Sequence, residues 1–402
     1  MHILVINAGS SSVKFTLYDT AGMRPATTGM VERIGLAGTA VRYRNGNGGQ
    51  VKRRVAVKDI RAAVRLISEL LSDPENGVIG SDREVSAVGH RVVHGGEEMK
   101  AAVRIDDDVR KTIRSCFQLA PLHNPPNLDG IDACAERFPG VPQVAVFDTA
   151  FHCTLPERAY LYALPHSLCQ EEKIRRYGFH GTSHGYVSSK TAEFMGCPLE
   201  KLRMVTCHLG NGCSMAAVDG GRSVDTSMGF TPLEGLPMGT RCGDIDASIL
   251  LYLMEKHGMD PKRIAALLNR ESGFLGLGGT GSSDMRDLET SLAKGDPGAQ
   301  RVIRVFAYRI KKYIGAYAFA MGGLDAIVFT AGIGENSPLI RERALTGLEG
   351  FGIRLDTTLN MAADGGIREI QHADSRVRLL VVPTDEEQEI ARQTLDLVWA
   401  AE

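Results

Sequence analysis

The stretch from Val5 to Lys14 combines residue types that can hold a phosphate group. It reads VINAGSSSVK, so one glycine and three serines form a polar turn between two apolar segments. Backbone N–H groups in such a turn can approach an anion closely, and Lys14 adds a positive charge. The side-chain carbonyl of Asn7 could orient water bound to a metal ion. Residue types alone fit a phosphate-binding hairpin and an ordinary hairpin about equally well.

The segments around this turn have the pattern of an antiparallel hairpin. Residues 2–6 form an apolar run and residues 13–18 alternate, which predicts one strand on each side of the turn. The elements expected after it are strands over 28–34, 40–43 and 51–57, a helix over 59–72, a strand over 85–93, helices over 107–118 and 127–137, and a strand over 144–147.

The second half of the chain repeats this order. It contains a strand over 204–208, a glycine-rich turn over 209–214 and a returning strand over 215–218. The later elements are helices over 247–257, 261–270, 283–293 and 301–320, strands over 326–330 and 379–382, and a helix over 385–400 opened by a capping box from Thr384. Two similar hairpins, each followed by β and α segments, predict a duplicated α/β fold with a cleft between its halves.

The composition is that of a soluble globular chain. Of 402 residues, 43% are hydrophobic and 23% are charged, and the formal net charge is −2. This balance argues against nucleic acid or an anionic membrane as a partner. The N-terminus lacks the features of a signal peptide, and no apolar run reaches transmembrane length. The eight cysteines include no C-x-x-C pair, so free thiols in a reducing cytoplasm are expected.

Eight motifs resemble those of the acetokinase family, which lies in the acetate and sugar kinase/Hsp70/actin superfamily. They span the whole chain in the family's order, and together they are specific although each alone is weak. The motifs are VINAGSSSVK (5–14), HRVVHGG (90–96), FDTAFH (147–152), YGFHGTSH (177–184), HLGNGCS (208–214), MGTRCGD (238–244), GIGEN (332–336) and PTDEE (383–387).

The resemblance implies a fold, a domain division and an activity. The fold would be two duplicated actin/Hsp70-like (ribonuclease H-like) α/β domains, each with a mixed five-stranded sheet flanked by helices, around a central active-site cleft. Residues 1–150 would form the first domain, with the helix over 385–402 packing back onto it, and residues 151–384 the nucleotide-binding domain. The activity would be reversible, Mg²⁺-dependent, direct in-line transfer of the ATP γ-phosphoryl group to acetate. The products would be acetyl phosphate, which leads to acetyl-CoA, and ADP, and a cytoplasmic homodimer is expected.

Four residues match catalytic positions of the family. The guanidinium groups of Arg91 and Arg241 suit a carboxylate and phosphoryl oxygens, and the resemblance assigns acetate binding to Arg91 and transition-state stabilisation to Arg241. His180 would contact the phosphoryl group during transfer. Asp148, at the end of a strand, would be the active-site acid or base. His123 matches a further phosphate contact.

Magnesium and the nucleotide are assigned by the same resemblance. Asn7 and Glu386 match the metal positions, and Mg²⁺ (or Mn²⁺ in its place) would keep most of its waters. Glu386 also fits a structural role, because a carboxylate is favoured in the first turn of a helix. The nucleotide would contact Lys14 and three further segments: His208, Leu209, Gly210, Asn211 and Gly212; Asp284, Met285 and Arg286; and the adenosine loop of Gly332, Ile333, Gly334, Glu335 and Asn336.

A small apolar pocket is assigned to the acetate methyl group. Its members, which sequence pattern alone would assign to the core, are Val93, Leu122, Phe179 and Pro232. Such a pocket discriminates one methylene by about 1–3 kcal/mol, so propionate should be used less well. Cys242 adjoins Arg241, so modification of its thiol would inhibit the enzyme.

Three other activities compete with this prediction. A propionate kinase is the nearest alternative, because only the pocket would distinguish it. An Hsp70-like binding module shares the fold but needs a peptide-binding domain, for which the sequence leaves no spare segment. A hydrolase would release phosphate to water and would turn over ATP or acetyl phosphate without an acceptor.

Overall fold

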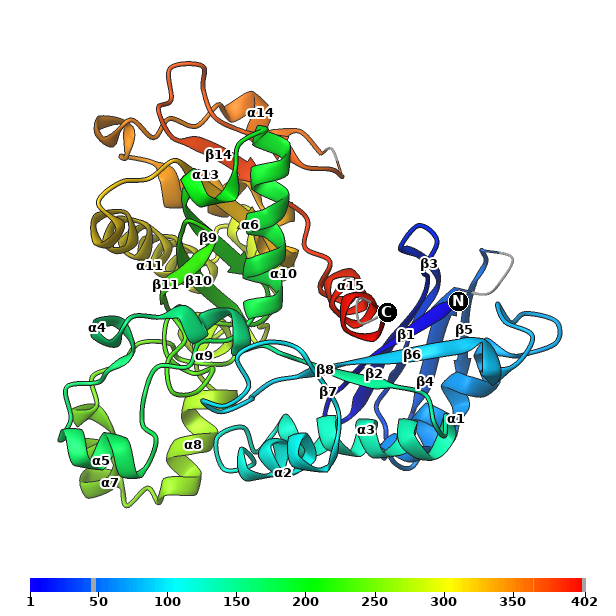
Figure 1. The fold of residues 1–402 in the computed structure, drawn as a ribbon. Coiled ribbons are helices and arrows are strands. Elements are labelled where there is room, and N and C mark those ends of the chain that lie inside the picture. The colour runs from blue at the N-terminus through cyan, green and yellow to red at the C-terminus, as the bar shows by residue number, and fades with distance from the viewer. Residues whose placement is uncertain (45–47, 364, 400–402) are drawn as a thin grey trace. The chain divides into compact units, whose positions relative to one another are not determined.

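The chain folds into two compact units, each with its own sheet (Figure 1). The computed structural model describes residues 1–44, 48–363 and 365–399. Unit 1 comprises Met1–Phe151 and Asp385–Glu402, and unit 2 comprises His152–Thr384. Within the described residues, none of the helices has the length and apolar character needed to span a membrane.

The sheet of unit 1 contains eight described strands in the order β5-β4-β3-β2-β1-β6-β8-β7. The strands are β1 (His2–Ala8), β2 (Ser12–Asp19), β3 (Arg24–Glu32), β4 (Ala40–Arg44), β5 (Gln50–Arg54), β6 (Val85–Val92), β7 (Val103–Arg104) and β8 (Gln143–Phe147). β1 and β2 form the predicted hairpin, with Asn7 opposite Lys14. β6 runs parallel to β1, and β8 runs parallel to β6.

Helices cover both faces of this sheet. They are α1 (Ile60–Leu71), α2 (Asp107–Ser115), α3 (Asn124–Arg137) and α15 (Glu386–Trp399), with short 3₁₀ turns at η1 (Asp82–Glu84) and η2 (Ala150–Thr154). Because side chains alternate along a strand, Leu4 and Ile6 of β1 belong to the core under α1 and α3, whereas Ile3 and Val5 pack with α15. α15 approaches so closely that a Cβ on Gly89 would lie 2.5 Å from Thr394 Oγ1.

The sheet of unit 2 has the order β11-β10-β9-β12-β14-β13 in the described residues. Its strands are β9 (Arg203–Leu209), β10 (Cys213–Asp219), β11 (Arg222–Thr226), β12 (Ala326–Thr330), β13 (Arg368–Glu369) and β14 (Arg378–Val381). β9 and β10 form the second hairpin, and β12 runs parallel to β9.

The helices of unit 2 pack around this sheet. They are α4 (Glu157–Tyr160), α5 (His166–Glu171), α6 (Gly181–Met195), α7 (Ser248–His257), α8 (Pro261–Arg270), α9 (Gly273–Gly278), α10 (Met285–Ala293), α11 (Pro297–Met321), α12 (Ala331–Asn336), α13 (Pro338–Leu345) and α14 (Thr357–Met361), with 3₁₀ turns η3 (Leu199–Lys201) and η4 (Glu349–Phe351). α11 contacts β9 and β10, α6 contacts β9 and β12, and Figure 1 shows the two helices on opposite sides of the sheet.

The two sheets share one topology, which confirms the duplicated α/β fold. The core β3-β2-β1-β6-β8 of unit 1 corresponds to β11-β10-β9-β12-β14 of unit 2, with the same parallel and antiparallel pairings. The prediction of five strands therefore describes the common core but not the whole sheets. β4, β5 and β7 extend the first sheet, and β13 extends the second.

Several element boundaries differ from the predictions, among them the start of α11, which is Pro297 and not residue 301. The helix predicted over 127–137 begins at Asn124, because two prolines fit its first turn, where no N–H donor is needed. Asp385, not Thr384, caps the last helix, since its carboxylate accepts a hydrogen bond from the Gln388 N–H at 2.8 Å. The predicted adenosine loop is the short helix α12.

Candidate active site

In unit 1, the ends of two neighbouring parallel strands bring Arg91 and Asp148 together. Arg91 is near the end of β6, and Asp148 directly follows β8. Arg91 Nε donates to Asp148 Oδ1 at 2.9 Å, and Arg91 Nη2 donates to Oδ2 at 2.7 Å. Asp148 is 1% exposed and the Arg91 side chain 20% exposed. This paired fork fixes the orientation of the guanidinium before any ligand binds.

Glu386, the first residue of α15, adds a second carboxylate to this pair. Its Oε2 lies 3.7 Å from Arg91 Nη1. Burial raises the pKa of Glu386, Arg91 opposes the shift, and Asp148 and Glu387 add to it. Burial disfavours the charged form of Arg91, but Asp148 and Glu386 more than compensate and raise its pKa. Lys14 Nζ lies 2.6 Å from Glu387 Oε1, so three carboxylates share two cations.

The predicted metal positions, Asn7 and Glu386, both belong to unit 1. In the part of the chain that the structure describes, no group of three or more His, Cys, Asp or Glu side chains is arranged to hold a metal ion. The excess of carboxylates around Glu386 nevertheless fits a divalent cation that keeps most of its waters. Lys14 also lies in unit 1, whereas the other predicted nucleotide contacts lie in unit 2.

In unit 2, a line of hydrogen-bonded side chains holds His180. Its Nδ1 lies 2.8 Å from Ser214 Oγ, which lies 2.8 Å from His184 Nε2. The other nitrogen of His184 lies 2.7 Å from Thr206 Oγ1. Burial lowers the pKa of His184 well below its ordinary value, and its histidine neighbours add to the shift. His184 is therefore neutral at physiological pH.

His208 stacks on His180, with ring centroids 4.2 Å apart. Its Nδ1 lies 2.8 Å from Ser183 Oγ, and the same hydroxyl lies 2.8 Å from Thr384 Oγ1. His180 itself adopts a left-handed backbone conformation, with φ of 56°, at the start of α6. These contacts fix two imidazoles side by side next to the turn between β9 and β10.

Arg241 lies against the same turn. A Cβ on Gly212 would be 3.9 Å from Arg241 Nη2 and 3.6 Å from His180 Nε2, so glycine keeps this space open. Arg241 Nη1 donates to the Pro232 carbonyl at 2.8 Å, and burial lowers the Arg241 pKa. No carboxylate among the described residues pairs with this guanidinium. A buried cation without a counter-ion, beside two imidazoles, is suited to an anion.

The predicted adenosine segment, α12, is held by a buried arginine. Arg341 is fully buried, and its Nη1 donates to the carbonyls of Gly334 at 2.8 Å and Glu335 at 3.0 Å. Its Nε donates to Asn360 Oδ1 at 2.7 Å. A Cβ on Gly332 would meet no atom within 4 Å, so a flat ligand can approach the backbone there.

The segment of Asp284, Met285 and Arg286 begins α10. Asp284 caps the helix through the Arg286 N–H at 2.9 Å and pairs with the Arg286 side chain. These contacts with Arg286 lower the pKa of Asp284 to about 2. The Arg286 side chain is 88% exposed, whereas Met285 is buried. Asp284 and Arg286 are thus available at the surface beside a helix N-terminus.

The four predicted pocket residues are divided between the units. Val93 is buried and Leu122 is 49% exposed in unit 1, next to His123 at the start of α3. Phe179 is buried and Pro232 half-buried in unit 2. A core assignment is therefore wrong for Leu122.

Several residues of the site were not predicted from the sequence. Ser214 is the last residue of the motif HLGNGCS, and His184 is the last residue of YGFHGTSH. A polar residue at the end of each motif was the signal that could have identified them. Thr206 and Arg341 gave no signal, because their roles depend on contacts made only in the folded unit. Burial raises the pKa of Cys242, which lowers its thiolate content and weakens the predicted sensitivity to thiol reagents.

The duplicated five-strand core is that of a phosphotransferase with an actin/Hsp70-type fold. The model of the acetokinase family matches residues 2–392. The chain belongs to the acetokinase family and is a kinase enzyme.

Three relatives illustrate this membership. The acetate kinase of Caldicellulosiruptor saccharolyticus is 52% identical over 399 residues, which cover 99% of this chain and 100% of the relative. The crystal structure of Porphyromonas gingivalis acetate kinase is 44% identical, with a TM-score of 0.94 and coverage of 99% of both chains. The crystal structure of a propionate kinase from Francisella tularensis is 39% identical, with a TM-score of 0.92, and the match covers 99% of this chain and 100% of that chain.

Proposed function

We propose that this enzyme transfers the γ-phosphoryl group of ATP reversibly to acetate, giving acetyl phosphate and ADP. Arg241 is the main support for this proposal. It is a buried cation beside a glycine turn, and it has no carboxylate partner among the described residues. Phosphoryl transfer requires mainly positioning and stabilisation of spread negative charge, which such a group supplies. Relatives about half identical to this chain that are named acetate kinases support acetate as the acceptor.

In unit 2, the hydrogen-bonded line would set the tautomer of His180. One assignment has Thr206 donating to His184 Nδ1 at 2.7 Å in preference to the Ala216 carbonyl at 3.5 Å, His184 Nε2–H donating to Ser214, and Ser214 donating to His180 Nδ1. His180 Nε2 then carries a proton and can donate a hydrogen bond to the phosphoryl group in transfer. Arg241 would stabilise the equatorial oxygens of that group.

In unit 1, Arg91 would bind the acetate carboxylate and Asp148 would hold Arg91 in place. Asp148 is bonded through both oxygens, so we propose that it orients Arg91 and the substrate rather than forming a covalent intermediate. Asn7 and Glu386 would hold Mg²⁺ through its waters, and the bound ion would neutralise phosphate charge. The resemblance also predicts an active-site cleft and a cytoplasmic location.

Propionate kinase remains the second candidate, because a neighbour of that name has a TM-score of 0.92. The acid preference would be set by Val93, Leu122, Phe179 and Pro232. Leu122, the exposed member, is the one most easily rearranged around a longer acid.

The deciding experiment traps acyl phosphate as hydroxamate from Mg-ATP with acetate, propionate or butyrate. We expect product with acetate above propionate, and loss of product on adding a chelator. Arg241→Ala should lower turnover by about 10²–10³-fold, whereas Arg222→Ala, an exposed arginine of unit 2, should not change it. ATP hydrolysis without acyl phosphate from any acid would favour the hydrolase or binding-module alternatives, and a preference for propionate would favour the propionate kinase.

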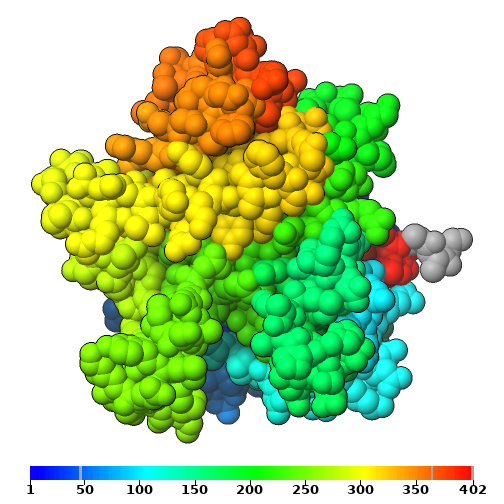
Figure 2. Space-filling view, turned by 90° about the vertical axis from the view of Figure 1, so that its left-hand side faces the viewer, coloured from blue at the N-terminus to red at the C-terminus, as the bar shows by residue number. Residues whose placement is uncertain are grey.

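We also propose a homodimer formed through α7. No residue of α7 is buried, although the helix is largely apolar, and Leu251 and Tyr252 are 64% and 52% exposed. Figure 2 shows the light green segment that contains α7 at the open surface. A second copy of the same face would cover this apolar helix by an isologous contact.

A further inference from the structure

The outer side of α11 carries a concentration of positive charge. Its inner side, including Val302 and Phe306, is buried in the core of unit 2. On the outer side, Arg301, Arg304 and Lys312 recur at helical spacing together with Tyr308. Like charges three or four residues apart destabilise a helix by themselves, so this pattern needs another explanation.

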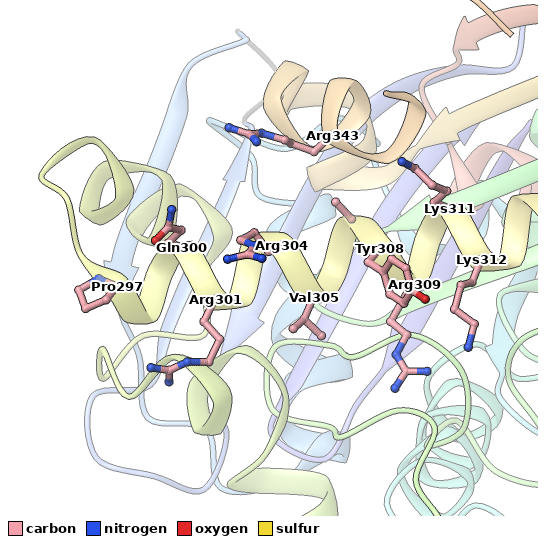
Figure 3. A pocket seen from close by; sticks show the side chains of 11 residues that line it. Pro297, Gln300, Arg301, Arg304, Val305, Tyr308, Arg309, Lys311, Lys312 and Arg343 are labelled. Carbon is pink, nitrogen blue, oxygen red and sulfur yellow. The ribbon is translucent and has the colours of Figure 1, made fainter. Parts of the chain in front are cut away.

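An open depression of about 860 Å³ lies along this side of α11. Six of its lining side chains are cationic and none is acidic: Arg301, Arg304, Arg309, Lys311, Lys312 and Arg343. Figure 3 shows Arg304 and Lys311 on the side of α11 toward Arg343 of α13, with Arg301, Arg309 and Lys312 on the other side. Cations from two helices therefore border one depression.

These cations are not neutralised by acidic neighbours. Arg304 and Arg343 form no ion pair with any described residue. Lys311 Nζ donates to the Thr346 carbonyl, and Arg301 Nη1 donates to the Leu277 carbonyl at 2.8 Å. The carboxyl pKa of Glu349 is lowered mainly by backbone hydrogen bonds and to a lesser extent by Lys311, and Glu349 lies outside the depression. The depression therefore has a net positive field.

We infer that this depression binds a small molecule carrying two or more phosphate groups, at a site separate from the residues assigned to phosphoryl transfer. Its volume lies in the range of small-molecule sites, which favours a compact ligand over a long polyanion. Guanidinium groups pair with phosphate oxygens in bidentate fashion, and Arg304 and Arg343 are open for that contact. Tyr308, 61% exposed, offers an aromatic face on which a nucleobase can stack.

The test is a calorimetric titration of inorganic tripolyphosphate into the full-length protein. Three proteins are compared: the wild type, Arg304→Glu/Arg343→Glu, and the control Lys201→Glu/Arg222→Glu. The control changes the net charge equally, with exposed residues of unit 2 outside the depression. We expect binding to be at least about tenfold weaker in the depression variant only. If charge reversal disturbs folding, the milder Arg304→Gln/Arg343→Gln variant takes its place. Its fold is checked by circular dichroism, and it should show the same loss of binding.

The outcomes separate this site from the catalytic one. Equal binding by all three proteins, or no binding to the wild type, would refute the inference. Preferential binding of a single-stranded oligonucleotide, without tripolyphosphate binding, would refute it in favour of a macromolecular partner. Repeating the titration with ATP and with Tyr308→Ala distinguishes the sources, since a loss for ATP but not for tripolyphosphate in that variant would assign a nucleotide stacked on Tyr308. The depression variant should still form hydroxamate from Mg-ATP and acetate. Binding at the depression and the proposed activity are thus measured independently, and a negative binding result would not contradict the activity.

Discussion

The two arginines assigned to the site differ in their counter-ions. Arg91 is held by both oxygens of Asp148 and lies near Glu386, so its charge is balanced within unit 1. Arg241 is bonded to a main-chain carbonyl and has no carboxylate partner in the described residues. A balanced arginine recognises shape and orientation, whereas an unbalanced one contributes its full charge to an arriving anion. We therefore expect Arg241 to act mainly on turnover.

Ser214→Ala should uncouple His180 from His184. The hydroxyl bridges the two rings at 2.8 Å on each side, so its loss frees the tautomer and orientation of His180. We expect kcat to fall about 10–100-fold with little change in the KM for ATP. The control is Ser188→Ala, which removes a buried hydroxyl bonded only to the His184 carbonyl. An equal fall in both variants would indicate a general packing effect.

Glu386→Gln should stabilise the protein near neutral pH while lowering its activity. Burial raises the folded-state pKa of Glu386, so the folded state binds a proton more readily than the unfolded state, and stability is lost as pH rises through the folded pKa. The variant avoids this cost, and we expect its Tm at pH 7.5 to rise by about 2 °C. The gain should vanish below the ordinary carboxyl pKa. Melting curves measured from pH 7.5 down to the ordinary carboxyl pKa test this expectation, with the exposed Glu342→Gln as control. A gain in Tm that does not depend on pH would contradict it.

At the scale of elements, α15 connects the core of unit 1 to the candidate site. Ile390 and Ala391 pack in the core that contains Ile3 and Val5, while the first turn of the helix presents Glu386. The start of the helix is fixed by Asp385, which also accepts a hydrogen bond from the Tyr18 hydroxyl at 3.3 Å. The position of Glu386 thus depends on a capping residue.

Asp385→Ala should destabilise the protein by about 1 kcal/mol and also lower turnover. Asp385→Asn keeps a capping acceptor, and it removes a carboxylate whose pKa burial raises, so it should retain both properties. Urea unfolding and hydroxamate assays measure the two effects. The matched control is Asp260→Ala, which removes the cap of α8 in unit 2 and should change stability alone. Normal turnover in Asp385→Ala would show that the cap does not position Glu386.

Leu251→Glu should separate the proposed dimer into monomers. A charge in the centre of the apolar face of α7 would be buried without a partner by a second copy. Light scattering after size-exclusion chromatography would measure the mass. Phe319→Glu, at a residue 77% exposed on α11, is the control and should remain dimeric. A monomeric wild type would refute the dimer itself.

At the scale of the whole molecule, each unit has a separate core and a share of the candidate residues. Lys14, Arg91 and Asp148 belong to unit 1, whereas His180 and Arg241 belong to unit 2. Neither unit alone contains all the groups that the proposed transfer requires. Activity should therefore depend on both units being folded.

Calorimetric unfolding should resolve two transitions, one for each unit. A ligand stabilises the state that binds it, so Mg-ADP should raise the transition of unit 2, which holds most predicted nucleotide contacts. Val205→Ala, in the core of unit 2, identifies that transition, and Val64→Ala, in the core of unit 1, is its matched counterpart. A single transition with equal calorimetric and van't Hoff enthalpies would contradict this expectation.

Local patterns were enough to predict much of the fold. The apolar run of β12 was predicted over its observed range, because a fully buried strand is distinctive, and the two glycine turns marked both hairpins. The start of α3 was missed because its prolines resemble a break. Thr206 and Arg341 act through partners distant in sequence, so no local pattern could reveal them. The resemblance assigned Leu122 to the same apolar pocket as Val93, and only the structure shows that Leu122 is 49% exposed whereas Val93 is buried.

The discontinuity of unit 1 has a consequence for synthesis on the ribosome. His152–Thr384 separate β8 from α15, and at about 5–20 residues per second their translation takes on the order of 10–50 s. During that time the sheet face containing Ile3 and Val5 lacks its covering helix. The nascent chain is thus exposed to chaperones and proteases until α15 emerges. Since Glu386 arrives with that helix, a chain arrested earlier lacks a residue that we propose holds Mg²⁺.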